Sequence, residues 1–335
     1  MTEDNDLREQ NNGIAGKAVL MFPGQGSQYI GMGAEFLNEN KEYLKYFETA
    51  GDVFGENLLG ILNDKDGKGE LLDQTQYSQI AIYSLSCALN DYLFKQKGFE
   101  KSSVKTTVGH SLGDYCALYS CGAYDFRQGA ELVSFRGKLM ADFAKGGKMM
   151  MAAVIGSDYE TIKSVLQNFN RDVFIANYND YSQIVISGTA EAVLKAGEEL
   201  KISGAKRVIP LKVSIASHCP LMKEISLNLE DYISSKFQGF PDLGLKFFSS
   251  TELRFIDKNQ IKETLVNQLV SPVKWVSAIE ELLTNDVTVF IEVGPGKVLS
   301  GLIKRIASKL GREDIMIFDM DSLNDINNLK TYLRT

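Results

Sequence analysis

Residues 104–121 read Val-Lys-Thr-Thr-Val-Gly-His-Ser-Leu-Gly-Asp-Tyr-Cys-Ala-Leu-Tyr-Ser-Cys. The first five predict a buried strand, and the residues from Asp114 onward predict a closely packed helix, because their side chains are small or apolar. Between them, Gly109 to Gly113 place a Gly-x-Ser-x-Gly motif on the turn from strand to helix. Such a turn is the context of a nucleophile elbow, which exposes the Ser hydroxyl while the glycines relieve crowding. An ordinary helix N-terminus with Ser111 as its cap is the alternative interpretation.

A serine is a poor nucleophile unless a neighbouring base takes its proton, and histidine is the usual base near neutral pH. The chain has two histidines. His110 adjoins Ser111, where neighbouring side chains diverge, so we expect a structural role for it. His218, on a loop after a strand predicted at Lys212–Ala216, is the remaining candidate, although a lone loop histidine can be incidental. No Asp or Glu stands out as a third member, so we expect a Ser-His dyad oriented by a backbone carbonyl.

The chain before this turn predicts the start of an α/β body. Lys17 to Phe22 is a short apolar run ended by Pro23-Gly24, which predicts a buried strand and a glycine-rich loop. Leu71 to Phe94 is apolar on most faces, as in a helix buried between other elements. The loop lacks a dinucleotide-binding Gly-x-Gly-x-x-Gly motif, because Tyr29 occupies the third glycine position. For residues 1–16 we expect a flexible N-terminal lead-in.

Residues 149–212 change character and predict a β-α-β-β-α-β order, the split arrangement of ferredoxin-like folds. We expect them to form a small subdomain inserted into a large one, which comprises residues 17–148 and 213–335. The elements predicted in the small subdomain are strands at Met149–Ile155, Val173–Tyr178, Gln183–Ser187 and Ala205–Val213 and helices at Asp158–Phe169 and Ala190–Leu200. The large subdomain then resumes, with strands predicted near Lys246–Ser249 and at Val287–Val293, helices around Ile261–Leu283, and a closing helix after Gly294-Pro295-Gly296.

Composition and charge exclude several classes of protein. Of the 335 residues, 44% are hydrophobic and 24% charged, which are globular values and exclude intrinsic disorder. The net charge of −7 lacks the overall positive field that holds nucleic acid or anionic membranes. No apolar run approaches the roughly 18 residues that span a bilayer. The four cysteines form no Cys-x-x-Cys pair, which favours buried thiols in a reducing cytoplasm over disulfides or a metal site.

Six separated motifs run through the chain in order. They are Phe22-Pro-Gly-Gln-Gly-Ser-Gln28, Gly109-His-Ser-Leu-Gly113, Phe135-Arg-Gly-Lys-Leu-Met140, Ser217-His-Cys219, Gln268-Leu-Val-Ser-Pro-Val-Lys-Trp275 and Gly294-Pro-Gly-Lys-Val-Leu-Ser300. Together they resemble the malonyl-CoA:acyl carrier protein transacylases of fatty-acid synthesis, which are related to the acyltransferase domains of polyketide synthases. The resemblance implies an α/β fold: a hydrolase-like three-layer body with an inserted ferredoxin-like (βαββαβ) small subdomain.

The resemblance also assigns roles to individual residues. It implies that Ser111 is the nucleophile, that His218 is its base, and that the backbone carbonyl of Gln268 orients the imidazole. The backbone N–H groups of Gln25 and Leu112 would form the oxyanion hole, which suits loop and helix starts where such groups are unpaired.

Substrate recognition is likewise implied by the resemblance. Arg136 matches an arginine that pairs with the free carboxylate of malonate, and a guanidinium offers such a group a bidentate fork. Ser217, before the histidine, resembles the malonyl-type members. Asn177 and Asn179 match asparagines that line the cleft between the subdomains. Four positions depart from the family pattern: Asp114 where glutamate is usual, Ile80 and Ala216 where proline is frequent, and Asp180-Tyr-Ser182 where Ser-Pro-Gly is common.

The implied reaction is a ping-pong transfer of malonyl from coenzyme A, through a Ser111 ester, to the phosphopantetheine thiol of acyl carrier protein. Malonyl-CoA is then a substrate, and no cofactor or metal is expected. We expect a cytoplasmic monomer that binds neither nucleic acid nor membrane. Because acyl carrier proteins are acidic, a local basic surface is needed; its candidates are Lys138, Lys145, Lys148, Lys297, Lys304 and Arg305.

Three alternatives stay open at this point. A stand-alone acyltransferase that serves a polyketide synthase would perform the same chemistry for a different carrier. A serine thioesterase or hydrolase would use the same dyad with water as the acceptor, and it would not need Arg136. A carrier-binding scaffold with a vestigial site is the third, although a scaffold has no reason to keep the nucleophile, the base and the arginine together.

Overall fold

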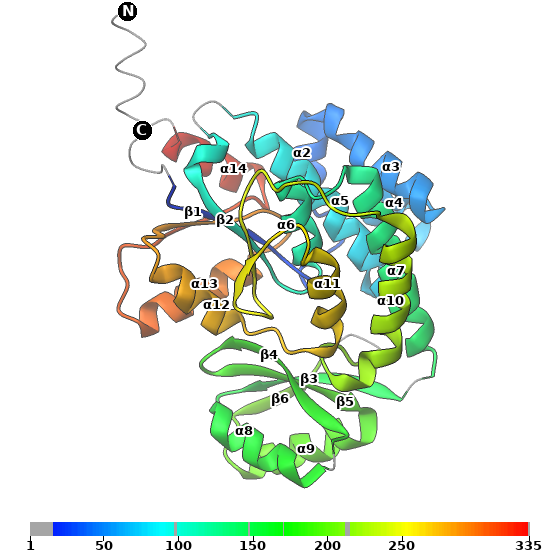
Figure 1. The fold of residues 1–335 in the computed structure, drawn as a ribbon, viewed down its shortest axis with the longest axis vertical. Helices are drawn as coiled ribbons and strands as arrows, with labels where there is room; N and C mark the ends of the chain where they lie inside the picture. Colours follow the sequence, from blue (N-terminus) through cyan, green and yellow to red (C-terminus); the bar gives the residue numbers. More distant parts are fainter. Residues whose placement is uncertain (1–15, 97–98, 147, 170, 212–214, 334–335) are drawn as a thin grey trace, which may run out of the picture.

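A computed structural model describes residues 16–96, 99–146, 148–169, 171–211 and 215–333. The predicted lead-in at residues 1–16 therefore lies outside the described residues except for Gly16. The structure has a body built on one sheet and a smaller unit built on a second sheet, drawn below it in Figure 1. This is the α/β fold class that the sequence predicts.

The larger sheet has six strands in the order β10-β9-β1-β2-β7-β8. All neighbouring pairs are parallel except β7 and β8, which are antiparallel. Because β1 and β2 are adjacent and parallel, their carboxyl ends bring the first glycine-rich loop and the Gly-x-Ser-x-Gly turn to the same edge. The strands are β1 (Ala18–Phe22), β2 (Val104–Gly109), β7 (Phe247–Ser249), β8 (Arg254–Ile256), β9 (Val289–Glu292) and β10 (Met316–Asp319).

Strand β1 is buried on both faces, and its alternate side chains enter two different cores. Ala18, Leu20 and Phe22 pack into the larger core, whereas Val19 and Met21 pack into the other. Helices cover both faces, which gives the body three layers (Figure 1). On the larger core lie α3 (Leu44–Phe54), α5 (Thr75–Leu93), α6 (Gly113–Cys121), α7 (Phe126–Ala144), α10 (Lys223–Lys236) and α11 (Ile261–Val270); α12 (Trp275–Leu283) and α13 (Val298–Lys309) cover the other.

The smaller sheet is antiparallel and has the order β4-β5-β3-β6. Its elements follow one another as β3, α8, β4, β5, α9 and β6, the βαββαβ order expected of a ferredoxin-like unit. The helices pack on one face, where Val154, Ile162 and Ile186 form a core. The elements are β3 (Met149–Ile155), α8 (Tyr159–Leu166), β4 (Val173–Asp180), β5 (Gln183–Thr189), α9 (Ala190–Ile202) and β6 (Arg207–Pro210).

The two units meet where β4 passes the segment between α11 and α12. The main chains of Tyr178 and Val273 are joined by a hydrogen bond of 2.8 Å, and the N–H of Val273 donates to Ala176 at 2.9 Å. Arg305 on α13 forms an ion pair of 2.5 Å with the buried carboxylate of Asp180. These contacts hold the end of β4 close to the carboxyl edge of the large sheet.

One predicted strand differs from the structure, and three observed elements were not predicted. The predicted strand Lys212–Ala216 lies partly outside the described residues, and Ile215 and Ala216, which are described, have no strand pairing. Their apolar character reflects burial in the larger core instead. The sequence reasoning also did not anticipate the short strands β8 and β10 or the last helix, α14 (Leu323–Tyr332). In the described part of the chain, no helix combines the length and apolar character that a membrane crossing requires.

Candidate active site

The turn between β2 and α6 has the geometry of a nucleophile elbow. Ser111 has a φ of 55°, a left-handed conformation that costs a non-glycine residue on the order of 1–3 kcal/mol. The turn lies tightly against the end of β1: a Cβ on Gly113 would stand 1.9 Å from the carbonyl oxygen of Phe22. Only glycine fits this close approach. The hydroxyl of Ser111 is thereby presented at the carboxyl edge of the sheet.

The structure places His218 beside this hydroxyl. Nε2 of His218 is 2.7 Å from Oγ of Ser111, and Nδ1 is 2.8 Å from the carbonyl oxygen of Gln268. Because a carbonyl oxygen only accepts, we assign the proton to Nδ1, which leaves Nε2 to accept the proton of the serine hydroxyl. The predicted dyad of Ser111 and His218 therefore lies together with the Gln268 carbonyl that orients the imidazole. His218 is itself held in a left-handed conformation, with a φ of 58°.

Burial controls the protonation of this imidazole. His218 is 3% exposed, and the loss of hydration lowers the pKa of its imidazole to about 3. The hydrogen bond to Gln268 opposes this effect, whereas the positive charge of Arg136 adds to it. The imidazole is therefore neutral at pH 7, the form that a general base requires.

Arg136 lies on α7, fully inside the site, with only 2% of its surface exposed. Its Nη1 donates to Oε1 of Gln79 at 2.6 Å, and its Nη2 lies 3.4 Å from Oγ of Ser111. Nε has no hydrogen-bond partner, and none of the ion pairs of the described residues involves this guanidinium. The ring of Tyr115 lies 5.4 Å from the guanidinium carbon. A buried cation without a paired carboxylate is suited to an anionic group of a ligand.

Two main-chain N–H groups at the predicted oxyanion hole have no acceptor among the described residues: those of Gln25 and Leu112. Gln25 follows β1, and its side chain is anchored by donation to Thr75 at 3.1 Å. Its loop packs against the elbow, since a Cβ on Gly24 would stand 2.4 Å from the carbonyl oxygen of His110. Leu112 directly precedes α6, where main-chain N–H groups are free of helical partners.

The side chain of Gln268 and the carboxyl group of Asp114 belong to the same cluster, and sequence reasoning missed both. Nε2 of Gln268 donates to the carbonyl oxygen of Ser111 at 2.8 Å and also to Oδ2 of Asp114. Oε1 of Gln268 accepts from Nη2 of Arg136 at 3.5 Å. The sequence signal that could have indicated this cluster is Asp114, an acidic residue at the start of a helix whose other side chains are mostly small or apolar.

The smaller unit contributes Asn179 to the elbow. Its Oδ1 lies 2.9 Å from Nε2 of His110, whose ring packs 5.5 Å from that of Trp275. His110 thus has the structural position that the sequence predicts, because it links the elbow to the end of β4. Asn177 is buried, and its main chain forms a parallel β-bridge with Val273. No hydrogen bond of the described residues connects Asn177 to Ser111 or His218.

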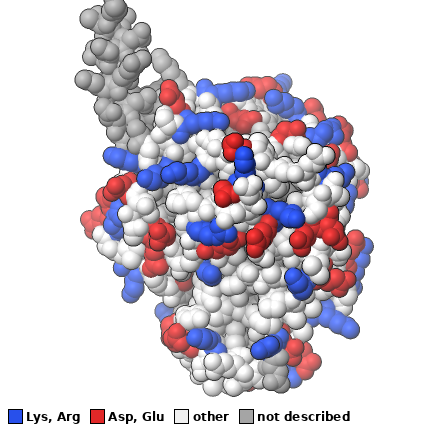
Figure 2. Space-filling model, in the orientation of Figure 1, with Lys and Arg blue, Asp and Glu red and all other residues white. Residues whose placement is uncertain are grey.

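Half of the candidates for the expected basic surface are paired with acidic side chains. Lys and Arg alternate with Asp and Glu over the face shown in Figure 2. Of the six candidates, Lys145, Lys297 and Arg305 form ion pairs with Asp142, Asp325 and Asp180, and Lys138 donates to the carbonyl oxygen of Phe54 at 3.0 Å. Within the described residues, Lys148 and Lys304 have no acidic partner.

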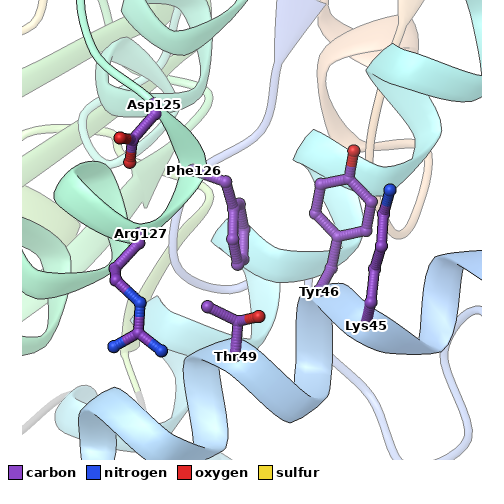
Figure 3. Close-up of a pocket in the computed structure, with 6 residues that line it drawn as sticks. All are labelled: Lys45, Tyr46, Thr49, Asp125, Phe126 and Arg127. Carbon is purple, nitrogen blue, oxygen red and sulfur yellow. The ribbon is translucent and has the colours of Figure 1, made fainter.

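A separate hollow of about 330 Å³ lies between α3 and the start of α7 (Figure 3). Tyr46 and Phe126 form its aromatic wall, and the side chains of Lys45 and Arg127 border it. None of the predicted site residues lines this hollow. The candidate active site is therefore the cluster around Ser111.

The chain is similar to known proteins over most of its length. Residues 19–318 match the family model described as acyl transferase domain. The malonyl CoA-acyl carrier protein transacylase of Bacillus subtilis is 38% identical over 298 residues, which are 88% of this chain and 92% of that protein. That of Haemophilus influenzae is 35% identical and covers 92% of this chain and 98% of its own.

Solved structures agree with these matches. The malonyl-CoA:acyl carrier protein transacylase of Xanthomonas oryzae superposes with a TM-score of 0.88 at 31% identity, covering 95% of this chain and 98% of its own. A malonyl-transacylase solved in complex with its type II polyketide synthase acyl-carrier protein gives a TM-score of 0.87 at 32% identity, covering 94% and 99%. The chain belongs to the acyl transferase domain family and, within it, to the malonyl CoA-acyl carrier protein transacylases.

Proposed function

We propose that this protein transfers a malonyl group from coenzyme A to the phosphopantetheine thiol of acyl carrier protein, through an ester on Ser111. One observation carries the proposal: the hydroxyl oxygen of Ser111 lies 2.7 Å from Nε2 of His218 and 3.4 Å from Nη2 of Arg136. The base and a buried cation suited to a carboxylate thus both lie beside the nucleophilic hydroxyl of Ser111. The names of the relatives support the same reaction.

The first half-reaction forms the acyl-enzyme. Ser111 attacks the thioester carbonyl as Nε2 of His218 takes the hydroxyl proton, and the main-chain N–H groups of Gln25 and Leu112 stabilise the oxyanion. Collapse of this intermediate breaks the carbon–sulfur bond, and the imidazolium returns its proton to the departing coenzyme A thiolate. In the second half-reaction, His218 takes the proton of the carrier thiol, the thiolate attacks the ester, and Ser111 regains the proton.

Arg136 provides the selectivity. Only one methylene separates the free carboxylate of a malonyl ester from its ester carbonyl, so this carboxylate would lie close to Oγ of Ser111. The Nη2 group of Arg136 lies 3.4 Å from this oxygen, and its Nε has no hydrogen-bond partner in the described part of the chain. A bidentate, charge-assisted pair in a buried site favours malonyl over a neutral acetyl group.

Radiolabel transfer tests the proposal. The protein is incubated with labelled malonyl-CoA, separated from free nucleotide, and mixed with the holo form of a bacterial acyl carrier protein. We expect the label on the protein to move to the carrier, and the apo carrier, which has no thiol, to remain unlabelled. Release of the label as free malonate in both cases would instead support a hydrolase.

The carrier and the cellular setting are further parts of the proposal. Supply of fatty-acid synthesis is supported by the named relatives, and the relative in complex with a polyketide synthase carrier gives the alternative acceptor. Transfer rates to the two types of carrier distinguish them. We further propose a cytoplasmic monomer that needs no cofactor, because Ser111 carries the acyl group itself; the four cysteines are free and buried, as in proteins of a reducing compartment.

A further inference from the structure

The side chain of Gln268 connects the functional groups of the site to one buried carboxyl group. Its Nε2 donates to the carbonyl oxygen of Ser111 at 2.8 Å and to Oδ2 of Asp114, while its Oε1 accepts from Nη2 of Arg136 at 3.5 Å. Its own main-chain oxygen accepts from His218 at 2.8 Å. One residue therefore contacts the elbow, the base and the guanidinium.

Asp114 and the carbonyl oxygen of Ser111 together determine which way this amide faces. The carbonyl oxygen of Ser111 can only accept, and Oδ2 of Asp114 also accepts here, so the amide presents its NH₂ group to both. Its oxygen is then directed at the guanidinium of Arg136. A reversed amide would place its oxygen against the carbonyl oxygen of Ser111 and its NH₂ group against the guanidinium. Without Asp114, the preference for the observed orientation weakens.

The surroundings of Asp114 favour the neutral form of its carboxyl group over a charged counter-ion to Arg136. The side chain is fully buried, and Oδ1 has no hydrogen-bond partner among the described residues. Burial raises the pKa of this carboxyl group to about 8, against the opposing effects of Gln268 and Arg136. The other titratable groups that act on it are Glu252, after β7, and the neutral phenols of Tyr115 and Tyr124.

We propose that Asp114 is a positioning residue for acyl selectivity: through the amide of Gln268 it fixes the guanidinium of Arg136 beside Ser111 and leaves that positive charge to the substrate carboxylate. This inference rests on the proposed malonyl transfer. It goes further by assigning a function to the one position after the Gly-x-Ser-x-Gly turn where the chain departs from the family pattern.

Two substitutions separate positioning from charge. Asp114→Ala removes the acceptor that orients the amide, whereas Asp114→Asn keeps an acceptor of the same shape. Acyl-enzyme formation is measured with malonyl-CoA and acetyl-CoA. We expect Asp114→Ala to lower kcat/KM for malonyl-CoA by about 10- to 100-fold, mainly by raising KM. The same variant should change kcat/KM for acetyl-CoA by less than about threefold. Asp114→Asn should restore malonyl loading to within about threefold of the wild type.

An equal loss for both acyl groups, or an Asn variant as impaired as the Ala variant, would overturn the inference, because a merely structural role predicts those results. Absence of any malonyl adduct on the wild type would instead overturn the proposed function. The two failures are therefore distinguishable.

The pH dependence gives a second test that does not need a stable Ala variant. Above pH 8 the ionised carboxylate would compete for Arg136, so KM for malonyl-CoA should rise by up to about tenfold between pH 7 and 9. KM for acetyl-CoA should stay level, and Asp114→Asn should abolish the rise.

Glu292→Gln is the matched control for this test. Glu292 is another buried carboxyl group with its pKa raised to about 7 by burial, but it accepts hydrogen bonds from Leu299 and Ser300. This variant should keep the wild-type rise. A rise that persists in Asp114→Asn, or that is parallel for the two acyl groups, would contradict the assignment.

Discussion

Nη2 of Arg136 lies 3.4 Å from the hydroxyl oxygen of Ser111, so the cation suited to a substrate carboxylate stands directly beside the nucleophile. The arginine comes from α7 and the serine from the β2–α6 turn, and the packing of both elements on the larger core sets this distance. The short separation matches a diacid with one methylene between its carbonyl groups. We therefore expect acyl length and acyl charge to be recognised at the same place in the site.

The rate of acyl-enzyme formation should not fall with the ionisation of a histidine near pH 6.5. Burial lowers the pKa of His218 to about 3, and a general base acts in its neutral form. The neutral fraction is thus complete from pH 8 down to about pH 5, and the rate should fall only below that. Rapid-quench measurement of the first turnover between pH 5 and 8 checks this. A titration with an apparent pKa of 6 to 7 would contradict it.

The elbow should not tolerate a side chain at Gly113. A Cβ there would stand 1.9 Å from the carbonyl oxygen of Phe22, so Gly113→Ala should lower the free energy of unfolding by at least about 3 kcal/mol or yield insoluble protein. Gly301→Ala on α13 is the control, since its nearest new contact is 3.6 Å away. Alanine in a helix should leave stability equal or raise it by up to about 1 kcal/mol. Denaturant unfolding of both variants provides the measurement.

The junction between the two units should depend on Arg305. Its partner Asp180 has a side chain that is 2% exposed, so Arg305→Ala leaves a buried carboxylate without its cation. We expect the free energy of unfolding at pH 7 to fall by about 1–3 kcal/mol. Lys304→Ala, at the neighbouring position without an acidic partner among the described residues, should change it by less than about 0.5 kcal/mol. Equal effects of the two variants would contradict the ion pair's role.

Carrier recognition should depend on cations that are not already paired. Lys148 and Lys304 have no acidic partner in the described part of the chain, unlike Lys297, which is paired with Asp325. Charge reversal to Glu at Lys148 and Lys304 together should slow transfer to the acidic carrier by about tenfold at low salt, and less at high salt. Loading from malonyl-CoA serves as the internal control. A transfer rate and salt dependence like those of the wild type would exclude this surface.

The dyad could be predicted because its determinants are local. The serine stands in a five-residue motif on a strand-to-helix turn, and a chain with two histidines leaves few choices of base. The roles of Arg136 and of the Gln268 carbonyl could be predicted only from the resemblance to a family, because a single arginine or glutamine in a sequence does not indicate that it lies in a site. The structure places all four together, in the arrangement that the resemblance implies.

The remaining differences have physical causes. The hydrogen bond between Gln268 and Asp114 joins residues 154 positions apart, and no local pattern indicates such a contact. The contact of His110 with Asn179 and the ion pair of Arg305 with Asp180 depend in the same way on how the smaller unit sits against the body. Strands β8 and β10 are short edge strands that lack a continuous buried run, so apolar periodicity does not reveal them.

The central claim, a malonyl ester on Ser111 selected by Arg136, is tested most directly by intact-protein mass spectrometry after brief incubation with malonyl-CoA, acetyl-CoA and methylmalonyl-CoA. The wild type should gain one malonyl group, Ser111→Ala should gain none, and Arg136→Ala should lose malonyl labelling selectively. Equal labelling of the wild type by acetyl-CoA, or no adduct from any of the three thioesters, would contradict the account.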